Sequence, residues 1–311
     1  MRDFEKILRI TPLSIRRQLS YMADNDIYEI RFRLGRPVMI RCGMGEMLIG
    51  VRLPVTKDID QAYILTAADL KEMIEYISSY SLYAFESQLK SGFITIDGGH
   101  RVGITGKVIL EDNRIKTIRD ISCINLRIAH QIKGCANDVI RFIADRERGR
   151  VYHTMIISPP GCGKTTLLRD IIRQISDGSI YLKGMDVSVV DERSELAACS
   201  GGLPANDVGI RTDILDCCPK PEGMLMLLRA MSPKVIALDE IGSKEDIHSI
   251  EYCINSGISL IVTVHGNGVE DVAAKPVLGN LVRNHVFERY IVLNGKKLGK
   301  WQVFDSRGSI L

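Results

Sequence analysis

The chain of 311 residues lacks an apolar run long enough to cross a membrane as a helix, which takes about 20 consecutive apolar residues. Its first ten residues, MRDFEKILRI, carry charges among the apolar positions and do not resemble the core of a signal peptide. None of its eight cysteines forms a C-x-x-C pair, so the usual sequence signature of a zinc site is absent and a reducing compartment is favoured. We therefore expect a cytoplasmic protein that reaches a membrane only through a partner.

Aromatic residues and charge of one sign are also scarce. Phe, Trp and Tyr make up 6% of the chain, the net charge is +3, and no long run of Lys or Arg occurs. A surface that binds nucleic acid usually carries a basic stripe or aromatic residues on which bases stack. The composition therefore argues against direct nucleic-acid binding, and the length favours two globular domains.

Residues 151–170, VYHTMIISPPGCGKTTLLRD, carry the motif from which we predict the function. An apolar run predicts a buried strand, a turn of prolines and glycines follows, and an amphipathic run from Lys164 predicts a helix. Glycines let backbone N–H groups surround an anion, and a helix N-terminus attracts negative charge. We expect Lys164 to contact the β- and γ-phosphates of ATP and to face solvent without nucleotide, and the Thr165 hydroxyl to bind Mg²⁺. The predicted nucleotide-binding residues are Ser158, Pro159, Pro160, Gly161, Cys162, Gly163, Lys164, Thr165 and Thr166.

One position departs from the usual phosphate-loop pattern. The first glycine of that pattern, five positions before Gly163, is Ser158 in this chain. A side chain is tolerated at this position if the residue has a negative φ. We therefore expect Ser158 to affect the rate of reaction more than binding. A chance strand–turn–helix is the alternative to a nucleotide site, and the correct context on both sides of the loop argues against it.

An acidic motif follows further along the chain, where four apolar residues run into Asp239 and Glu240. In P-loop ATPases such an Asp holds the Mg²⁺ shell through water, and the Glu polarises the attacking water. The next strand ends at His265, which is placed to sense the γ-phosphate; a core histidine is the alternative. Within this half of the chain Lys164 has no obvious second cation beside it to balance the charge of the γ-phosphate.

The periodicity of apolar residues differs between the two halves of the chain. After residue 135, alternating strands and helices predict an α/β domain with a parallel, doubly wound sheet, including a helix at about 137–148 and a long polar connection at 199–213. Before it, a hairpin after residue 27, a helix after Thr66, a second helix at about 82–90 and strands joined by an Asp-Gly-Gly turn predict a smaller α+β domain. The predicted domains are residues 1–134 and 135–311.

Four segments in order, SPPGCGKTT, DERSE at 191–195, VIALDE and TVHGN at 263–267, resemble the motifs of the ATPases that drive type II and type IV secretion and pilus machines. The resemblance implies a RecA-like ATPase domain and places the Glu195 carboxylate near the nucleotide. In that superfamily the N-terminal domain also lends arginines to the nucleotide. DGGHRVGITG and INLRIA resemble the strands that carry them, which makes Arg101 and Arg127 candidates. The alternatives are a surface salt-bridge cluster for Glu195 and a solvated strand face for the arginines.

More narrowly, EIRFRLGRPVMI, DGGHRVGITG, PPGCGKTTLLRD and DERSELAA resemble the stage III sporulation family of endospore formers, along most of the chain. This resemblance implies a homo-hexameric ATPase in the mother-cell cytosol, docked on membrane proteins of a channel between mother cell and forespore. Two other functions stay open. One is a P-loop ATPase that acts on nucleic acid, and the other is a small-molecule kinase, which would use the same loop without Glu240 as water activator.

Overall fold

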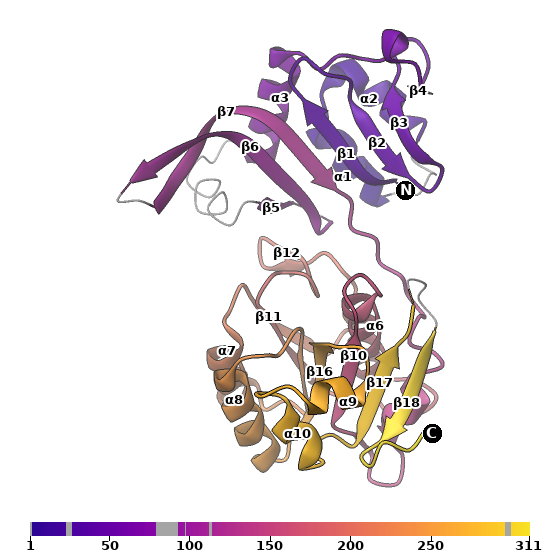
Figure 1. Cartoon of the computed structure of the whole chain (residues 1–311), viewed down its shortest axis with the longest axis vertical. Coiled ribbons are helices and arrows are strands. Elements are labelled where there is room, and N and C mark those ends of the chain that lie inside the picture. Colours follow the sequence, from indigo (N-terminus) through magenta and orange to yellow (C-terminus); the bar gives the residue numbers. More distant parts are fainter. Residues whose placement is uncertain (1, 23–26, 79–92, 97, 112–113, 296–299) are drawn as a thin grey trace. The chain divides into compact units, whose positions relative to one another are not determined.

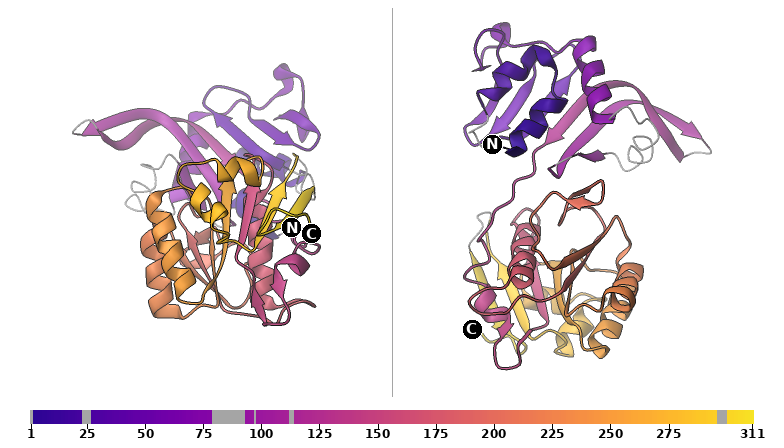
Figure 2. Two further views of the ribbon diagram at one scale, coloured as in Figure 1. Left: turned by 60° about the horizontal axis from the view of Figure 1, so that its bottom comes forward. Right: turned by 180° about the vertical axis from the view of Figure 1, so that it is seen from behind.

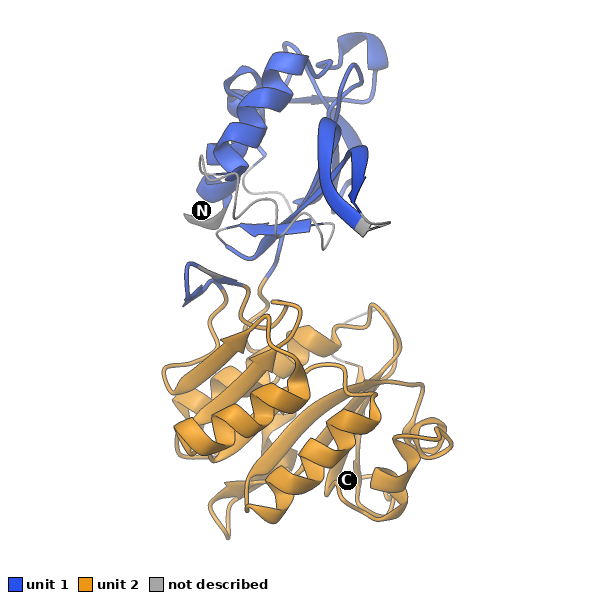
Figure 3. Cartoon of the chain, turned by 90° about the vertical axis from the view of Figure 1, so that its left-hand side faces the viewer, with its two compact units in different colours: residues 1–130, 199–205 blue, residues 131–198, 206–311 orange. Residues whose placement is uncertain are grey.

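The computed structural model describes the chain except residues 1, 23–26, 79–92, 97, 112–113 and 296–299 (Figure 1). It divides into two compact units, residues 1–130 with 199–205, and residues 131–198 with 206–311 (Figure 3). Each unit contains one seven-stranded sheet. The domain boundary after residue 134 stays a prediction. Residues 199–205, which lie within the second half of the sequence, belong to the first unit.

The first unit is built on an antiparallel sheet of order β4-β3-β2-β1-β7-β6-β5. Strand β1 alternates between buried residues such as Ile30 and Phe32 and more exposed arginines, so one face of the sheet packs into a core and the other is wet. The core contains apolar residues of α1, α2 and α3 together with those of the strands. The elements are α1 (Arg2–Ile10), α2 (Leu13–Ser20), β1 (Ile27–Arg33), β2 (Met39–Cys42), β3 (Gly45–Ile49), β4 (Val55–Thr56), η1 (Ile59–Gln61), α3 (Ala67–Ser78), β5 (Phe93–Ile96), β6 (His100–Glu111), β7 (Arg114–Arg127), β12 (Cys199–Ser200) and β13 (Leu203–Pro204).

The second unit is an α/β layer structure, and it confirms the predicted parallel sheet (Figures 1 and 2). Its strand order is β14-β11-β15-β16-β10-β17-β18, and all neighbours are parallel except β17 and β18. The elements are α5 (Ile140–Ile143), β8 (Ala144–Asp145), β9 (Arg150–Val151), β10 (Thr154–Ser158), α6 (Lys164–Asp177), β11 (Val187–Asp191), β14 (Thr212–Asp216), α7 (Lys220–Met231), β15 (Val235–Leu238), α8 (Lys244–Asn255), β16 (Ser259–His265), α9 (Val269–Ala273), α10 (Gly279–Arg283), β17 (Arg289–Leu293) and β18 (Trp301–Asp305).

Both faces of this parallel sheet are covered, which explains why its central strands are apolar throughout. Apolar residues of α7, α8, α9 and α10 form one core cluster with alternate residues of the strands, such as Met155 and Ile157 of β10. The intervening residue Ile156 points to the other face, and α6 packs against β10, β11, β14 and β16. Polar chemistry is therefore confined to the ends of the strands.

Two predicted segments differ from the structure. The helix expected at 137–148 is wrong, because α5 covers only Ile140–Ile143 and the chain then becomes extended at Ala144, turns at Gly149 (φ 62°), and pairs β8 with β9. The connection at 199–213 contains the β12–β13 hairpin and the start of edge strand β14, whose residues are all only half-buried. The helix predicted at 82–90 lies outside the described residues. Among the helices that the structure describes, none is long and apolar enough to span a membrane.

Candidate nucleotide-binding site

The predicted phosphate loop connects the end of β10 to the start of α6 at Lys164. Gly161 (φ 77°) and Gly163 (φ 85°) adopt left-handed conformations that residues with a Cβ avoid. Ser158 is not among the residues of positive φ; it is fully buried, and its hydroxyl donates to the Pro159 carbonyl at 2.7 Å. Serine therefore fits the position where the usual pattern has glycine. The Cys162 side chain is buried, so this residue presents its backbone rather than its thiol.

Lys164 is buried, which corrects the prediction that it faces solvent. Its ammonium group lies 3.2 Å from Glu240 Oε1 and 3.8 Å from Asp239 Oδ1. The reason is that the parallel strands β10 and β15 end at the same edge of the sheet, so the loop lysine meets both carboxylates that follow β15. A nucleotide that binds to this loop has to compete with these carboxylates for Lys164.

Asp239 connects the loop to strand β16. Its Oδ2 accepts a hydrogen bond from the Thr165 hydroxyl at 2.7 Å, and its Oδ1 accepts one from the Thr263 hydroxyl. Carboxylate and hydroxyl oxygens are the ligands that Mg²⁺ prefers, and with a nucleotide it takes few ligands from the protein. Over the part of the chain that the structure describes, no group of three His, Cys, Asp or Glu side chains could hold a metal. Thr165 and Asp239 fit a Mg²⁺ that shares its remaining ligands with phosphate and water.

Glu240 contacts more of the candidate site residues than its neighbour Asp239 does. Its backbone is in the left-handed region (φ 51°), a strained conformation typical of functional positions, and its N–H donates to the Thr263 hydroxyl at 2.9 Å. Its Oε1 lies 2.7 Å from His265 Nε2 as well as near Lys164, and its Oε2 lies 2.9 Å from Arg193. Burial raises the pKa of Glu240, but Lys164, His265 and Arg193 together bring that pKa below its usual value. Glu240 is therefore a carboxylate at neutral pH.

The acidic turn after β11 is held in place by hydrogen bonds with two buried side chains, Asp191 and Arg169. The buried Asp191 carboxylate accepts hydrogen bonds from the backbone N–H groups of residues 195, 196 and 197, at 2.8, 2.9 and 2.8 Å. Arg169 of α6 donates to the carbonyls of Leu196 at 2.7 Å and Glu195 at 2.6 Å. Burial raises the pKa of Asp191 and lowers that of Arg169. The turn is therefore held between a strand end and the helix of the phosphate loop.

Glu195 and Arg193 line one small cleft with Asp239 and Glu240. The placement of the Glu195 carboxylate near a nucleotide, which the family resemblance implies, stays a prediction. Arg193 was not predicted as a site residue, although it stands inside the DERSE segment. The signal was its position just past β11, the strand next to β15, since the carboxyl ends of neighbouring parallel strands meet. The site therefore contains a second cation beside Lys164, contrary to expectation.

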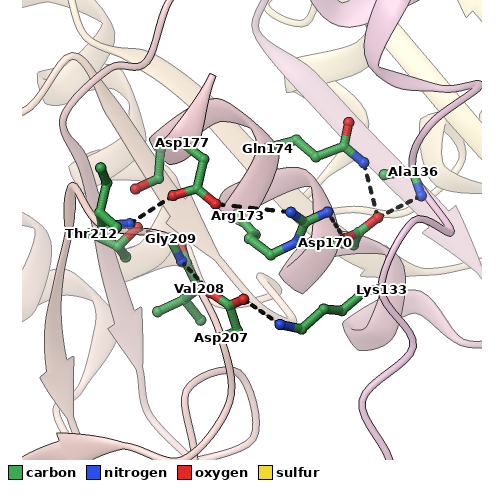
Figure 4. A network of polar contacts seen from close by, with 12 residues as sticks. Lys133, Ala136, Asp170, Arg173, Gln174, Asp177, Asp207, Val208, Gly209 and Thr212 are labelled. Carbon is green, nitrogen blue, oxygen red and sulfur yellow. Dashed lines mark hydrogen bonds and ion pairs between the residues drawn. The ribbon is translucent and has the colours of Figure 1, made fainter. Parts of the chain in front are cut away.

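The helix of the phosphate loop is anchored by the buried carboxylate of Asp170 (Figure 4). It accepts hydrogen bonds from the Ala136 N–H at 2.8 Å, Gln174 at 3.0 Å, and two nitrogens of Arg173 at 3.0 and 2.7 Å. Burial raises the pKa of Asp170, but the hydrogen bonds from the Ala136 N–H and from Arg173 bring that pKa below its usual value. Helix α6 is therefore tied to the segment that enters the second unit.

Arg101 and Arg127 lie directly opposite each other on β6 and β7, so they share one face of the first unit's sheet. Arg127 is also opposite Glu29 of β1, and the Arg101 guanidinium lies 4.5 Å from the centre of the Phe93 ring. Both belong to the first unit, whereas the phosphate loop belongs to the second. Their contact with a nucleotide stays a prediction.

Comparisons with known proteins agree with the resemblance drawn from the motifs. The family model described as "Sporulation stage III, protein AA" matches residues 1–311. The stage III sporulation protein AA of Bacillus subtilis (strain 168) is 38% identical over 98% of this chain and 96% of its own length. Among solved structures, the Legionella pneumophila ATPase DotB matches with a TM-score of 0.57 and 20% identity, over 91% of this chain and 76% of its own. The pilus retraction motor PilT with bound ADP matches with a TM-score of 0.58 and 15% identity, over 92% and 77%. The fold is thus the RecA-like fold of secretion ATPases.

Proposed function

The chain belongs to the family of sporulation stage III, protein AA, and from that premise we propose that it hydrolyses ATP at residues 158–166. One observation carries the proposal: Lys164 and Thr165 of the loop contact the carboxylates of Glu240 and Asp239 respectively. A lysine, a hydroxyl and two carboxylates in this order are the parts that P-loop ATPases use. The water-activating position of Glu240 favours hydrolysis over phosphoryl transfer to a small molecule.

In the proposed reaction Lys164 leaves Glu240 and binds the β- and γ-phosphates. The oxygen of a water molecule forms the new bond to the γ-phosphorus, the bond to the β–γ bridging oxygen breaks, and ADP leaves with that electron pair. Glu240 orients the water and takes its proton, His265 and Glu195 lie around it, and inorganic phosphate is released. Thr165, and Asp239 through water, would hold a Mg²⁺ ion, which would supply positive charge against the β- and γ-phosphates.

We further propose that ATP hydrolysis drives the movement or assembly of a secretion-like channel between mother cell and forespore. The sporulation family supports this setting, and the relatives of like fold include a protein described as a pilus retraction motor. We propose a homo-hexamer on the mother-cell side, attached to the membrane through channel proteins rather than through a span of its own.

ATP turnover by the purified full chain, with Mg²⁺ and after its removal by a chelator, tests the enzymatic proposal. We expect Mg²⁺-dependent release of phosphate and no stimulation by DNA or RNA. Stimulation by nucleic acid would favour the alternative ATPase class, and absence of both ATP binding and turnover would contradict the proposal. Light scattering with and without ATP measures whether the nucleotide brings six copies together.

A further inference from the structure

We propose that Arg193 is a catalytic arginine which binds Glu240 before ATP enters and moves to the γ-phosphate when ATP is bound. The inference rests on the proposed ATPase function and concerns a residue to which the motifs assign no role. It places an arginine for the γ-phosphate within the same unit as the phosphate loop. The candidates from the first unit, Arg101 and Arg127, would then be additional to it.

Arg193 lies at the edge of the parallel sheet where the phosphate loop and the two carboxylates meet. Arg193 follows β11 by two residues, and β11 pairs in parallel with β15, after which come Asp239 and Glu240. Ligands of open parallel sheets bind beyond the carboxyl ends of the strands. The Arg193 nitrogen lies 2.9 Å from Glu240 Oε2, and Lys164 lies 3.2 Å from Oε1 of the same carboxylate. Lys164 and Arg193 therefore contact the two oxygens of one carboxylate, so a phosphate that binds Lys164 lies close to Arg193 as well.

The backbone that follows Arg193 is held in place, whereas its guanidinium group is exposed to water. Asp191 and Arg169 hold the backbone that follows it through five hydrogen bonds, and Ser194 has a positive φ (52°). The Arg193 side chain itself is 65% exposed. An ion pair so open to water is weak, so exchange of one anionic partner for another costs little.

The cleft is lined by two cationic side chains, Arg193 and Lys220, which differ in exposure. The other cation of the cleft, Lys220, is buried in an ion pair with Glu192. Arg193 therefore differs from Lys220 in having a solvent-accessible head in that cleft. The γ-phosphate carries more negative charge than a carboxylate and accepts two parallel hydrogen bonds from a guanidinium, so it competes well for Arg193. Once Arg193 and Lys164 have moved to the phosphate, the carboxylate oxygens of Glu240 are able to accept a hydrogen bond from water.

The test compares the full chain with Arg193→Ala and Arg193→Lys, using Arg229→Ala as the matched control. Arg229 is an exposed arginine on α7 of the same unit, away from the cleft. The dissociation constants of ATP and ADP are measured separately with fluorescent nucleotide analogues, and kcat and KM are measured for ATP. We expect Arg193→Ala to reduce the preference for ATP over ADP about tenfold, as for one charge-assisted hydrogen bond, with ADP affinity unchanged. We expect kcat to fall about 10³-fold, as arginine fingers do, and Arg193→Lys to recover part of it.

Equal loss of ATP and ADP affinity would overturn the proposal, because Arg193 would then support the loop rather than the γ-phosphate. Unchanged turnover by Arg193→Ala would also overturn the proposal. Faster turnover would overturn it too, because Arg193 would then restrain Glu240 rather than assist the reaction. The comparison of ATP with ADP does not need turnover. If wild-type protein binds ATP without hydrolysing it, the proposed function fails while the affinity ratio still decides the role of Arg193.

Discussion

The two seven-stranded sheets of this chain present their polar residues in opposite ways. In the second unit both faces of the parallel sheet are buried, and the polar residues Ser158, Asp191 and His265 stand at the carboxyl ends of strands. In the first unit the antiparallel sheet has a wet face, on which arginines occupy the middles of strands as well as their ends. One sheet gathers its polar groups at an edge, and the other spreads them over a surface.

The wet face of the first unit has an internal order that alternation alone does not reveal. Across β2, β1, β7 and β6, the residues Arg41, Glu29, Arg127 and Arg101 are successive cross-strand partners. Glu29 is buried and accepts hydrogen bonds from Arg31, Arg41 and Asn125. Burial raises its pKa, and the contacts with Arg31, Asn125 and Arg41 lower that pKa below its usual value. The face is thus a row of cations around one carboxylate, whereas the cleft of the second unit places cations around several carboxylates.

The largest effect that we expect would give the wet face of the first unit a catalytic role, and the contrast between the two sheets would then no longer hold. If Arg101 and Arg127 reach a nucleotide, Arg101→Ala or Arg127→Ala should lower ATP turnover by roughly 10³ to 10⁵ and change ATP binding little. Arg119→Ala, an exposed arginine on the same strand as Arg127, is the control. The measurement is steady-state phosphate release together with the dissociation constant of ATP.

A mixing experiment then separates two versions of the arginine prediction. If the arginines act across subunits, an arginine variant mixed with Lys164→Ala should regain activity at mixed interfaces. Inactive single variants without rescue would favour action within one chain. Full activity of both arginine variants would leave the wet face as a solvated sheet surface.

The next effect concerns the chemical step at the edge of the parallel sheet. Glu240→Gln keeps the shape of the side chain but loses the charge that orients water, so turnover should fall by about 10² to 10⁴. ATP binding should survive, because Lys164 loses a competing partner. Glu251→Gln, an exposed position on α8, is the control. A Glu240→Gln variant that binds ATP poorly would instead assign Glu240 to the metal shell or to a structural role.

The edge of the second sheet could be predicted from the sequence because each motif there stands at or just after the carboxyl end of a parallel strand. Each strand is short and apolar and is followed within two residues by a polar group, so Asp239, Glu240 and His265 could be placed together by counting. Arg193 was missed because a turn of the form DERSE indicates only that charges cluster, and not which one points at Glu240. The burial of Lys164 was missed for a related reason, since it depends on the contact with two carboxylates that are distant in sequence.

The segment before the phosphate loop shows where periodicity fails. Residues 137–148 have a helical distribution of apolar residues, but tertiary contacts decide the local structure. The N–H of Ala136 is bonded to Asp170 of α6, and Ala144 pairs with Val151. A pattern that spans twelve positions cannot indicate such contacts, whereas in α6 the same kind of pattern coincides with tertiary packing and predicts the helix well.

Lys164→Ala should lose hydrolysis, as the mixing experiment requires, but its expected effect on binding is smaller, and that effect tests the edge as a binding site. A hydrogen bond to a charged group contributes about 1.5 to 3 kcal/mol, so ATP should bind roughly 10 to 150 times more weakly. Because Lys164 is buried between Asp239 and Glu240, its removal should also lower the free energy of unfolding by about 1 to 3 kcal/mol without nucleotide. Titration with ATP and urea unfolding measure the two effects. Unchanged ATP turnover would contradict the site assignment.

The smallest effect that we expect concerns the stability of the two units, each of which contains a buried carboxylate that accepts several hydrogen bonds. Asp69 of the first unit is buried and accepts hydrogen bonds from Ser14 at 2.7 Å, Tyr63 at 2.7 Å, and the backbone and hydroxyl of Thr66 at 2.9 and 2.6 Å. Burial raises its pKa, but the hydrogen bonds from Thr66 and Ser14 lower that pKa below its usual value, as those of Asp170 do in the second unit. A carboxyl group with a lowered folded-state pKa stabilises the protein above its unfolded pKa of about 3.9 and loses that contribution as pH falls through the folded value.

We therefore expect Asp69→Asn and Asp170→Asn each to cost about 1 to 2 kcal/mol at pH 7, and the cost to begin to fall below about pH 4 and to be lost once the pH has passed the folded-state pKa. The chain has one tryptophan, Trp301 on β18, which packs edge-on against Phe142 in the second unit. Its fluorescence reports unfolding of that unit, while circular dichroism follows both. Because the two units have separate cores, Asp170→Asn should shift the fluorescence transition in urea, and Asp69→Asn should shift only the circular dichroism. Equal shifts of the fluorescence transition by both variants would mean that the two sheets unfold as one cooperative structure.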